Sequence, residues 1–254
     1  MGRYTFDDLV AVMARLRGPG GCPWDRAQTP QTLRPYLLEE TYEVLDALDR
    51  GDPAGLREEL GDLLLQVVFH AQMAGEAGHF RADEIVDGLV RKLIERHPHV
   101  FGDARLETAE AVLAHWHNAK QARREGALDG IPAALPALAR AQKVQERARG
   151  QGFRWPDARA AVAKARDELA ELEEAATPAA AADELGDAFF TLINVAIFHG
   201  VDAEQAVRDA TRKFSERFTR VEALAAALGR PLPEHSLDEL LALWEQAKRD
   251  HAGG

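Results

Sequence analysis

At 254 residues the chain is long enough to bury a substantial core, either as one large domain or as two domains of ordinary size. Its 46% hydrophobic and 29% charged residues are typical of a folded globular protein and exclude extensive disorder, while a single cysteine excludes an internal disulfide framework. The net charge of −11 argues against polymeric nucleic acid as a partner, because the acidic surface would repel its phosphates.

Neither a secretory signal nor a membrane-spanning helix is predicted. No apolar run precedes Arg15, and the longest apolar stretches, residues 63–71 and 188–198, are too short to cross a bilayer. The lone Cys22 fits a reducing compartment. We therefore expect a cytoplasmic protein without a membrane partner.

A helical pattern runs through the chain and contains an internal repeat. Apolar residues recur at helical spacing, and alternating β-branched runs are nearly absent, so we predict an all-α fold. An acidic pattern near residue 40 returns 128 residues later, and a second pattern at residues 58–62 returns at 183–187. Glycines and a proline at 126–132 interrupt the helical pattern after a charged run at 121–125. These features predict two related domains, residues 1–128 and 129–254.

The acidic residues are spaced so that a helix places them on one face. Glu40 and Glu43 lie three residues apart, as do Glu59 and Asp62 on the next predicted helix, and two such helices packed antiparallel bring four carboxylates together. A single motif of this kind is ordinarily a solvated helix face, but the apolar runs that follow each second motif predict partial burial. The second half repeats the arrangement with Glu168, Glu171, Glu184 and Asp187.

Four partly buried carboxylates in one place need a counter-charge. Two like charges about 4 Å apart repel by roughly 1 to 4 kcal/mol between the dielectric constants of water and of a protein surface. Oxygen ligands without cysteine or histidine suit Mg²⁺ or Mn²⁺ and disfavour Zn²⁺. We therefore expect Mg²⁺ as the cofactor, with Mn²⁺ as a substitute, and a small polyanion bound through it.

Basic residues near the second acidic patterns are candidates for phosphate contacts. Lys164 lies one helical turn before the second-half acidic motif, and Lys213 and Arg217 are one turn apart on a later predicted helix. Surface ion pairs would explain any one of them, but the recurrence of the later pair as Lys92 and Arg96 favours a shared task.

Phe214 and Trp244 are the aromatic residues of the second half that accompany these cations. The first interpretation is that both belong to the core, as most aromatic residues at helical spacing do. The alternative is that they stack against a nucleobase.

The order of these motifs resembles the MazG nucleoside triphosphate pyrophosphohydrolases. The most specific part is Glu-Glu-x-x-Glu followed by Glu-x-x-Asp in tandem copies; the segments 21–25, 96–101 and 136–143 support it, and the resemblance covers nearly the whole chain. It implies two tandem all-α domains whose helices pair across a homodimer as four-helix bundles. It also implies Mg²⁺-dependent hydrolysis of nucleoside triphosphates to monophosphate and pyrophosphate, for housecleaning or control of nucleotide pools.

The resemblance also assigns roles to individual residues. The implied metal ligands and catalytic residues of the second domain are Glu168, Glu171, Glu184 and Asp187, with Glu40, Glu43, Glu59 and Asp62 as the metal ligands of the first. The implied nucleotide contacts are Lys164, Glu168, Asp187, Lys213, Phe214, Arg217 and Trp244. Asp167 and Asp183 replace the Glu39 and Glu58 of the first copy, so any supporting contact they make is open.

Three alternatives remain at this point. A related pyrophosphohydrolase could use the same site for a narrower substrate such as dUTP or phosphoribosyl-ATP. A non-enzymatic helical dimer could bind nucleotides or regulate a partner. In a mixed case, the first domain is structural or regulatory and only the second is catalytic.

Overall fold

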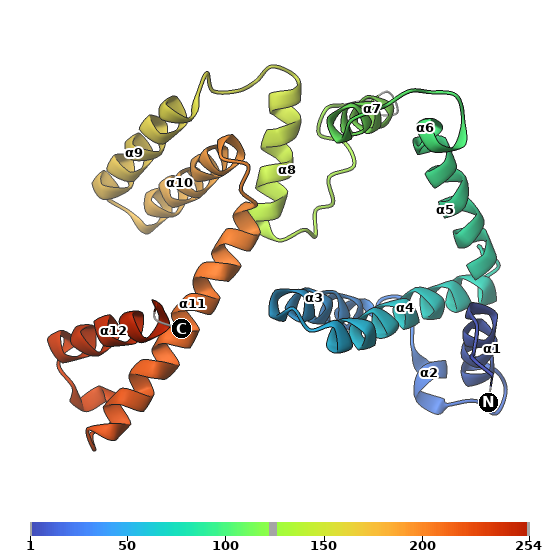
Figure 1. Cartoon of the computed structure of the whole chain (residues 1–254), viewed down its shortest axis with the longest axis horizontal. Coiled ribbons are helices and arrows are strands. Elements are labelled where there is room, and N and C mark those ends of the chain that lie inside the picture. Colours follow the sequence, from blue (N-terminus) through green and yellow to red (C-terminus); the bar gives the residue numbers. More distant parts are fainter. Residues whose placement is uncertain (1, 122–125, 253–254) are drawn as a thin grey trace. The chain divides into compact units, whose positions relative to one another are not determined.

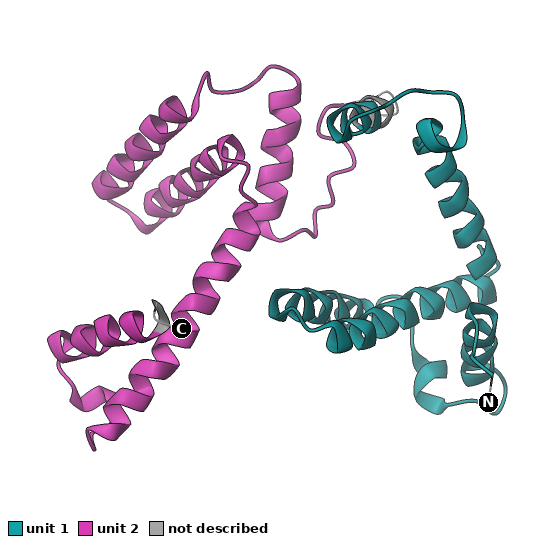
Figure 2. Ribbon diagram, in the orientation of Figure 1, with its two compact units in different colours: residues 1–117 teal, residues 118–254 magenta. Residues whose placement is uncertain are grey.

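The computed structural model describes residues 2–121 and 126–252. Within these residues the chain forms helices α1 to α12 and a short 3-10 helix, without strands, which confirms the all-α prediction (Figure 1). It divides into two compact units, residues 1–117 and 118–254 (Figure 2). The predicted boundary after residue 128 falls in the segment between α7 and α8. The part of the charged run at 122–125 lies outside the described residues.

The helices divide between the two halves of the chain. Those of the first half are α1 (Phe6–Arg17), α2 (Pro23–Ala27), α3 (Arg34–Arg50), α4 (Pro53–Glu76), α5 (Ala82–Arg96), α6 (Pro98–Phe101) and α7 (Ala109–Gln121). Those of the second half are α8 (Ala137–Gly150), α9 (Ala158–Glu174), α10 (Pro178–Phe198), α11 (Ala203–Ala227) and α12 (Leu237–Ala252), with the 3-10 helix Leu232–Glu234 before α12.

A tight turn joins α3 and α4 into an antiparallel pair (Figure 1). Gly51 ends α3 at a φ of 60°, a left-handed conformation that glycine adopts without the steric cost of a Cβ. Asp52 then caps α4, because its Oδ1 accepts hydrogen bonds from the backbone N–H groups of Ala54 and Gly55, both at 3.1 Å. Pro53 occupies the first turn of α4, where no N–H is needed.

Helices α9 and α10 form the corresponding pair of unit 2, and they lie side by side in Figure 1. Asp157 caps α9 by accepting from the Ala160 N–H at 2.8 Å, and Thr177 caps α10 by accepting from the Ala180 N–H at 3.2 Å. Pro178 follows at the start of α10, as Pro53 does in α4. The two hairpins therefore reproduce the internal repeat of the sequence, including a capped helix that opens with proline.

Each unit has its own buried cluster of apolar side chains. In unit 1 the cluster packs α1 against the hairpin and contains Met13, Leu33, Val68, Phe69 and Met73. In unit 2 a cluster packs α12 against the C-terminal half of α11 and contains Val221, Ala225, Leu243 and Ala247. Neither cluster contains a residue of the acidic motifs, which lie on the α3–α4 and α9–α10 hairpins.

Among the described residues, no single helix is both long enough and apolar enough to cross a membrane. Helices α10 and α11 together would meet the criterion by length and composition, but a bend of 102° separates them.

Candidate metal and nucleotide site

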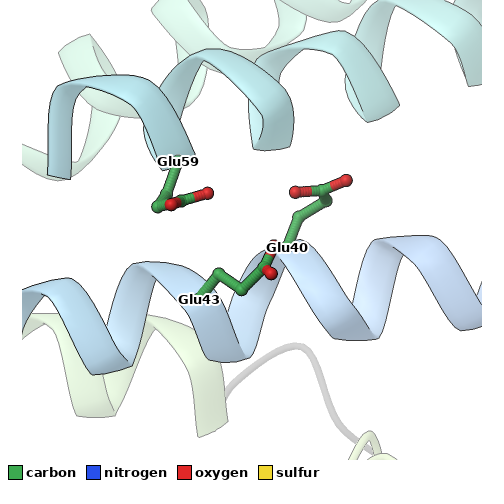
Figure 3. A group of neighbouring side chains, drawn as sticks. All are labelled: Glu40, Glu43 and Glu59. Carbon is green, nitrogen blue, oxygen red and sulfur yellow. The ribbon is translucent and has the colours of Figure 1, made fainter. Parts of the chain in front are cut away.

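Three glutamates of unit 1 converge between α3 and α4. Glu40 and Glu43 come from adjacent turns of α3, and Glu59 of α4 points toward them across the hairpin (Figure 3). One carboxylate oxygen from each lies within 4.8 Å of the others. Glu40 and Glu59 are half-buried, while Glu43 is exposed. Such a group of oxygen atoms has the size and chemistry to hold one divalent cation.

The same arrangement occurs in unit 2 between α9 and α10. Glu168 and Glu171 of α9 and Glu184 of α10 each place a carboxylate oxygen within 4.8 Å of the others. Glu168 is only 4% exposed, whereas Glu184 is half-buried and Glu171 is exposed. A buried carboxylate at the base of an otherwise accessible cluster is a strong reason to expect a cationic partner, because desolvating a charge without a partner is costly.

Burial and the repulsion of neighbouring charges raise the pKa of Glu40, Glu59 and Glu184. The pKa of Glu184 is raised, first by desolvation and then by the negative charges of Glu171 and Glu168. The pKa of Glu40 is raised by desolvation and by the charge of Asp62. These three carboxyl groups therefore hold protons more tightly than isolated glutamates do, because burial and neighbouring negative charges disfavour their ionised form.

The two predicted aspartate ligands stand one turn beyond the triads. Asp62 is close enough for its charge to raise the pKa of both Glu40 and Glu59. Asp187 is exposed on α10, three residues after Glu184 and therefore on the same helix face. Within the described structure, neither belongs to the groups whose oxygens lie within 4.8 Å. The structure thus brings three of the four predicted ligands of each set together.

Lys164 adds a positive charge to the unit 2 cluster. It lies one turn before Glu168 on α9, so the two side chains share a helix face. Its Nζ lies 2.8 Å from Glu168 Oε1 and 4.0 Å from Glu171 Oε1. The hydrogen bond to Glu168 raises the pKa of Lys164, so its ammonium is held in the charged form. In unit 1 the residue four positions before Glu40, which corresponds to Lys164, is Tyr36. The counterpart position in unit 1 therefore carries no positive charge.

The remaining predicted nucleotide contacts lie on the α11–α12 pair. The rings of Phe214 and Trp244 are 5.1 Å apart between centroids, and Phe214 also stacks on Phe218 at 5.9 Å. Lys213 is exposed on α11, and Arg217 one turn later is half-buried, with a buried Nε that has no hydrogen-bond partner among the described residues. The structure thus brings the two rings together on the α11–α12 pair, and Lys164 together with the acidic triad on the α9–α10 hairpin.

Known proteins share these motifs over most of the chain. The profile of the MazG nucleotide pyrophosphohydrolase domain matches residues 28–101, which include the unit 1 triad. A Thermotoga maritima protein named nucleoside triphosphate pyrophosphohydrolase/pyrophosphatase MazG is 44% identical over 246 residues, covering 96% of this chain and 95% of that protein.

Two further relatives carry a similar name. The nucleoside triphosphate pyrophosphohydrolase of Escherichia coli strain K12 is 45% identical over 254 residues, covering 96% of this chain and 97% of that protein. That of Mycolicibacterium smegmatis is 38% identical and covers 95% of this chain and 70% of its own length. The likeness to the first two therefore covers nearly the whole of this chain and of each relative.

Proposed function

The chain belongs to the MazG family, and we propose on that basis that it is an enzyme that hydrolyses nucleoside triphosphates to nucleoside monophosphate and pyrophosphate with Mg²⁺, or Mn²⁺ in its place. The observation that carries the proposal is the convergence of three glutamates from α9 and α10 beside Lys164. All the donor atoms are carboxylate oxygens, and burial together with the charges of Glu171 and Glu168 raises the pKa of Glu184, so the group fits a hard divalent cation.

The chain's own residues prepare this site for a triphosphate. Glu168, Glu171 and Glu184 would hold the cation, and Asp187 would complete the set when a ligand draws it inward. The bound cation would lower the pKa of a water molecule and neutralise charge on the phosphates. Lys164 holds the buried Glu168 in place through its 2.8 Å ion pair and offers positive charge at the edge of the cluster. Lys213 and Arg217 supply further cations for the pyrophosphate that leaves.

We assign the principal activity to unit 2. Both triads place one oxygen of each carboxylate within 4.8 Å of the others, but Lys164 stands beside the second, whereas Tyr36 stands at the matching position of the first. The Tyr36 ring contacts the Trp24 ring instead, with centroids 5.9 Å apart. Unit 1 would then serve a structural or regulatory role while keeping the capacity to bind a cation.

We also propose a homodimer, because α5 exposes an apolar stripe. Val86, Leu89, Val90, Leu93 and Ile94 follow helical spacing, and each is 44 to 47% exposed. A contiguous uncovered stripe of this kind marks a surface that packs against another helix. A second copy of the chain satisfies it by symmetry.

Light scattering on the purified protein is expected to give twice the mass of one chain. Leu89→Glu would place a charge in the stripe and is expected to shift the mass toward that of a single chain. Arg91→Gln, which changes an exposed residue of the same helix, is expected to leave the dimer intact. A single-chain mass for the unmodified protein would contradict the proposal.

Stabilisation by Mg²⁺ is expected to depend on pH. Because the pKa of Glu184 is higher in the folded protein than in the unfolded chain, protonation stabilises the metal-free fold at low pH, and this contribution is lost as pH rises through the raised pKa. Mg²⁺ replaces those protons. The increase in Tm on adding Mg²⁺ should therefore be large at about pH 8 and small at about pH 5. Thermal melts with and without Mg²⁺ measure it, and a pH-independent increase would argue against binding at the triads.

The reaction itself is tested by measuring pyrophosphate released from a panel of canonical and modified nucleoside triphosphates, with Mg²⁺ and with a chelator. Including dUTP and phosphoribosyl-ATP separates broad from narrow specificity. Release of orthophosphate instead of pyrophosphate would mean that a different bond is cut. No release from any substrate would favour a nucleotide-binding or regulatory dimer over an enzyme.

A further inference from the structure

Helix α11 leaves α10 at a sharp corner that the local backbone does not fix by itself. The two helices meet at a bend of 102°, and residues 199–202 separate them. Gly200 in this corner has a φ of 65°, in the left-handed region that glycine adopts without strain. Because glycine has a wide choice of backbone angles, contacts with another helix are needed to hold the direction of α11.

Gln142 of α8 makes such contacts on both sides of the helix start. Its Nε2 donates to the backbone carbonyl of Val201 at 3.3 Å, and its Oε1 accepts from the backbone N–H of Ala203 at 2.8 Å. Ala203 is the first residue of α11, where an N–H group has no partner within its own helix. One amide of α8 therefore holds the end of the corner and the beginning of α11.

Glu204 of α11 makes the reciprocal contact with α8. The N-cap residue of α8 is Pro136, whose side chain has no hydrogen-bond acceptor. Glu204 Oε2 instead accepts from the backbone N–H of Ala139, in the first turn of α8, at 3.4 Å, and its charge lies at the positive end of that helix. The starts of the two helices lie side by side in Figure 1. Gln142 and Glu204 thus form a clamp between α8 and α11.

The direction of α11 decides where its cations lie. Lys213 follows Ala203 by ten residues, so it stands about 15 Å from the clamp at about 1.5 Å per residue. At that distance a change of about 10° in the direction of the helix moves Lys213 by roughly 2.6 Å, and it moves Arg217 further. A misplacement of about 1 Å can cost about a hundredfold in rate. The clamp therefore acts at the base of a long lever.

Unit 1 has a different residue at the position of Gln142. The entry loops at 21–24 and 152–155 align the two halves, and this alignment places Ala11 opposite Gln142. An alanine side chain neither donates nor accepts a hydrogen bond, so unit 1 cannot make the same contact. The clamp belongs to the unit that also carries Lys164 beside its triad.

We propose that Gln142 and Glu204 are positioning residues for hydrolysis, which tie α8 to α11 and thereby place Lys213 and Arg217 for their phosphate contacts. The proposal rests on the proposed hydrolysis of nucleoside triphosphates and adds how the cations of α11 are held in place. The clamp residues act through these two cations and do not touch the substrate.

Steady-state hydrolysis of ATP with Mg²⁺ by the full chain tests the proposal. Gln142→Ala is expected to lower kcat/KM by about tenfold, mainly through KM. In a Lys213→Ala protein the same substitution should cost at most about threefold, because one of the groups that it positions is already gone. Glu204→Ala tests the other contact and should also lower kcat/KM, whereas Glu204→Gln keeps the accepting oxygen and should retain most of the activity.

Asp202→Ala is the matched control at the same corner. Asp202 Oδ1 accepts from the backbone N–H of Gln205 at 2.9 Å, so it caps α11 from within the helix start. Its removal should lower Tm, as removal of Gln142 should, but it leaves the clamp in place. The value of kcat/KM for Asp202→Ala should therefore stay within about twofold of the unmodified protein.

Four results would overturn the proposal. Equal losses of activity in Gln142→Ala and Asp202→Ala, at equal falls in Tm, would mean that the clamp only stabilises the fold. Losses that multiply fully in the protein carrying both Gln142→Ala and Lys213→Ala would separate the clamp from the cations. Unchanged kcat/KM in Gln142→Ala would refute the clamp alone. No hydrolysis by the unmodified protein would refute the proposed function as well.

Discussion

Glu171→Gln is expected to reduce kcat for nucleoside triphosphate hydrolysis by at least about a thousandfold while leaving the helical content unchanged. The substitution keeps the shape of the side chain and removes one of three carboxylates that lie within 4.8 Å of one another. A catalytic metal ion contributes several kcal/mol to transition-state stabilisation, and each 1.36 kcal/mol corresponds to about a factor of ten in rate. Pyrophosphate release measures the loss, and circular dichroism measures the fold.

A second readout separates loss of the cation from loss of the fold. Because the charge of Glu171 raises the pKa of Glu184, its removal relieves repulsion in the metal-free protein. The Tm without Mg²⁺ should therefore not fall, while the increase in Tm on adding Mg²⁺ should shrink. Glu173→Gln is the matched control, since it lies two residues further along α9 and about 200° around the helix. Full activity of Glu171→Gln would refute the assignment of the triad.

The sequence carried enough information to predict the hairpins and their acidic faces, because both follow from local spacing. Residues three apart share a helix face. The short turn at Gly51 and Asp52 reverses the chain between the two helices, so they pack antiparallel. The convergence of Glu40 and Glu43 with Glu59 follows from those two facts. The aspartates one turn further on were expected at the same place, and the structure leaves them beside the triads instead.

Features that depend on contacts between distant segments could not be read from spacing. Gln145 looks like an ordinary polar residue of α8, yet in the structure it is buried and donates a hydrogen bond to the Phe190 carbonyl, 45 residues away. The difference between Tyr36 and Lys164 was visible in the aligned repeats, but its meaning depends on the ion pair with Glu168. Burial of Glu168 to 4% likewise depends on the whole helix pair rather than on its motif.

Asp187→Asn is expected to lower kcat by at least about a hundredfold, equal to about 2.7 kcal/mol, whereas Asp62→Asn should leave turnover largely unchanged. The two aspartates occupy matching positions, three residues after Glu184 and Glu59, so the substitutions remove the same charge from the same place in each repeat. The difference in outcome should arise from their surroundings. Unit 2 has Lys164 beside its triad, while unit 1 has an aromatic contact at the matching position.

The paired comparison distinguishes the possible divisions of labour between the units. If each unit hydrolysed substrate independently, each variant would keep about half of the activity and the double variant would keep none. If unit 1 were the catalytic one, the ranking would be reversed. The increase in Tm on adding Mg²⁺ measures cation binding, which turnover does not report. If Asp62→Asn kept full turnover but showed a smaller increase in Tm, unit 1 would bind a cation without contributing to hydrolysis. Its acidic triad would then stabilise unit 1, while hydrolysis takes place in unit 2.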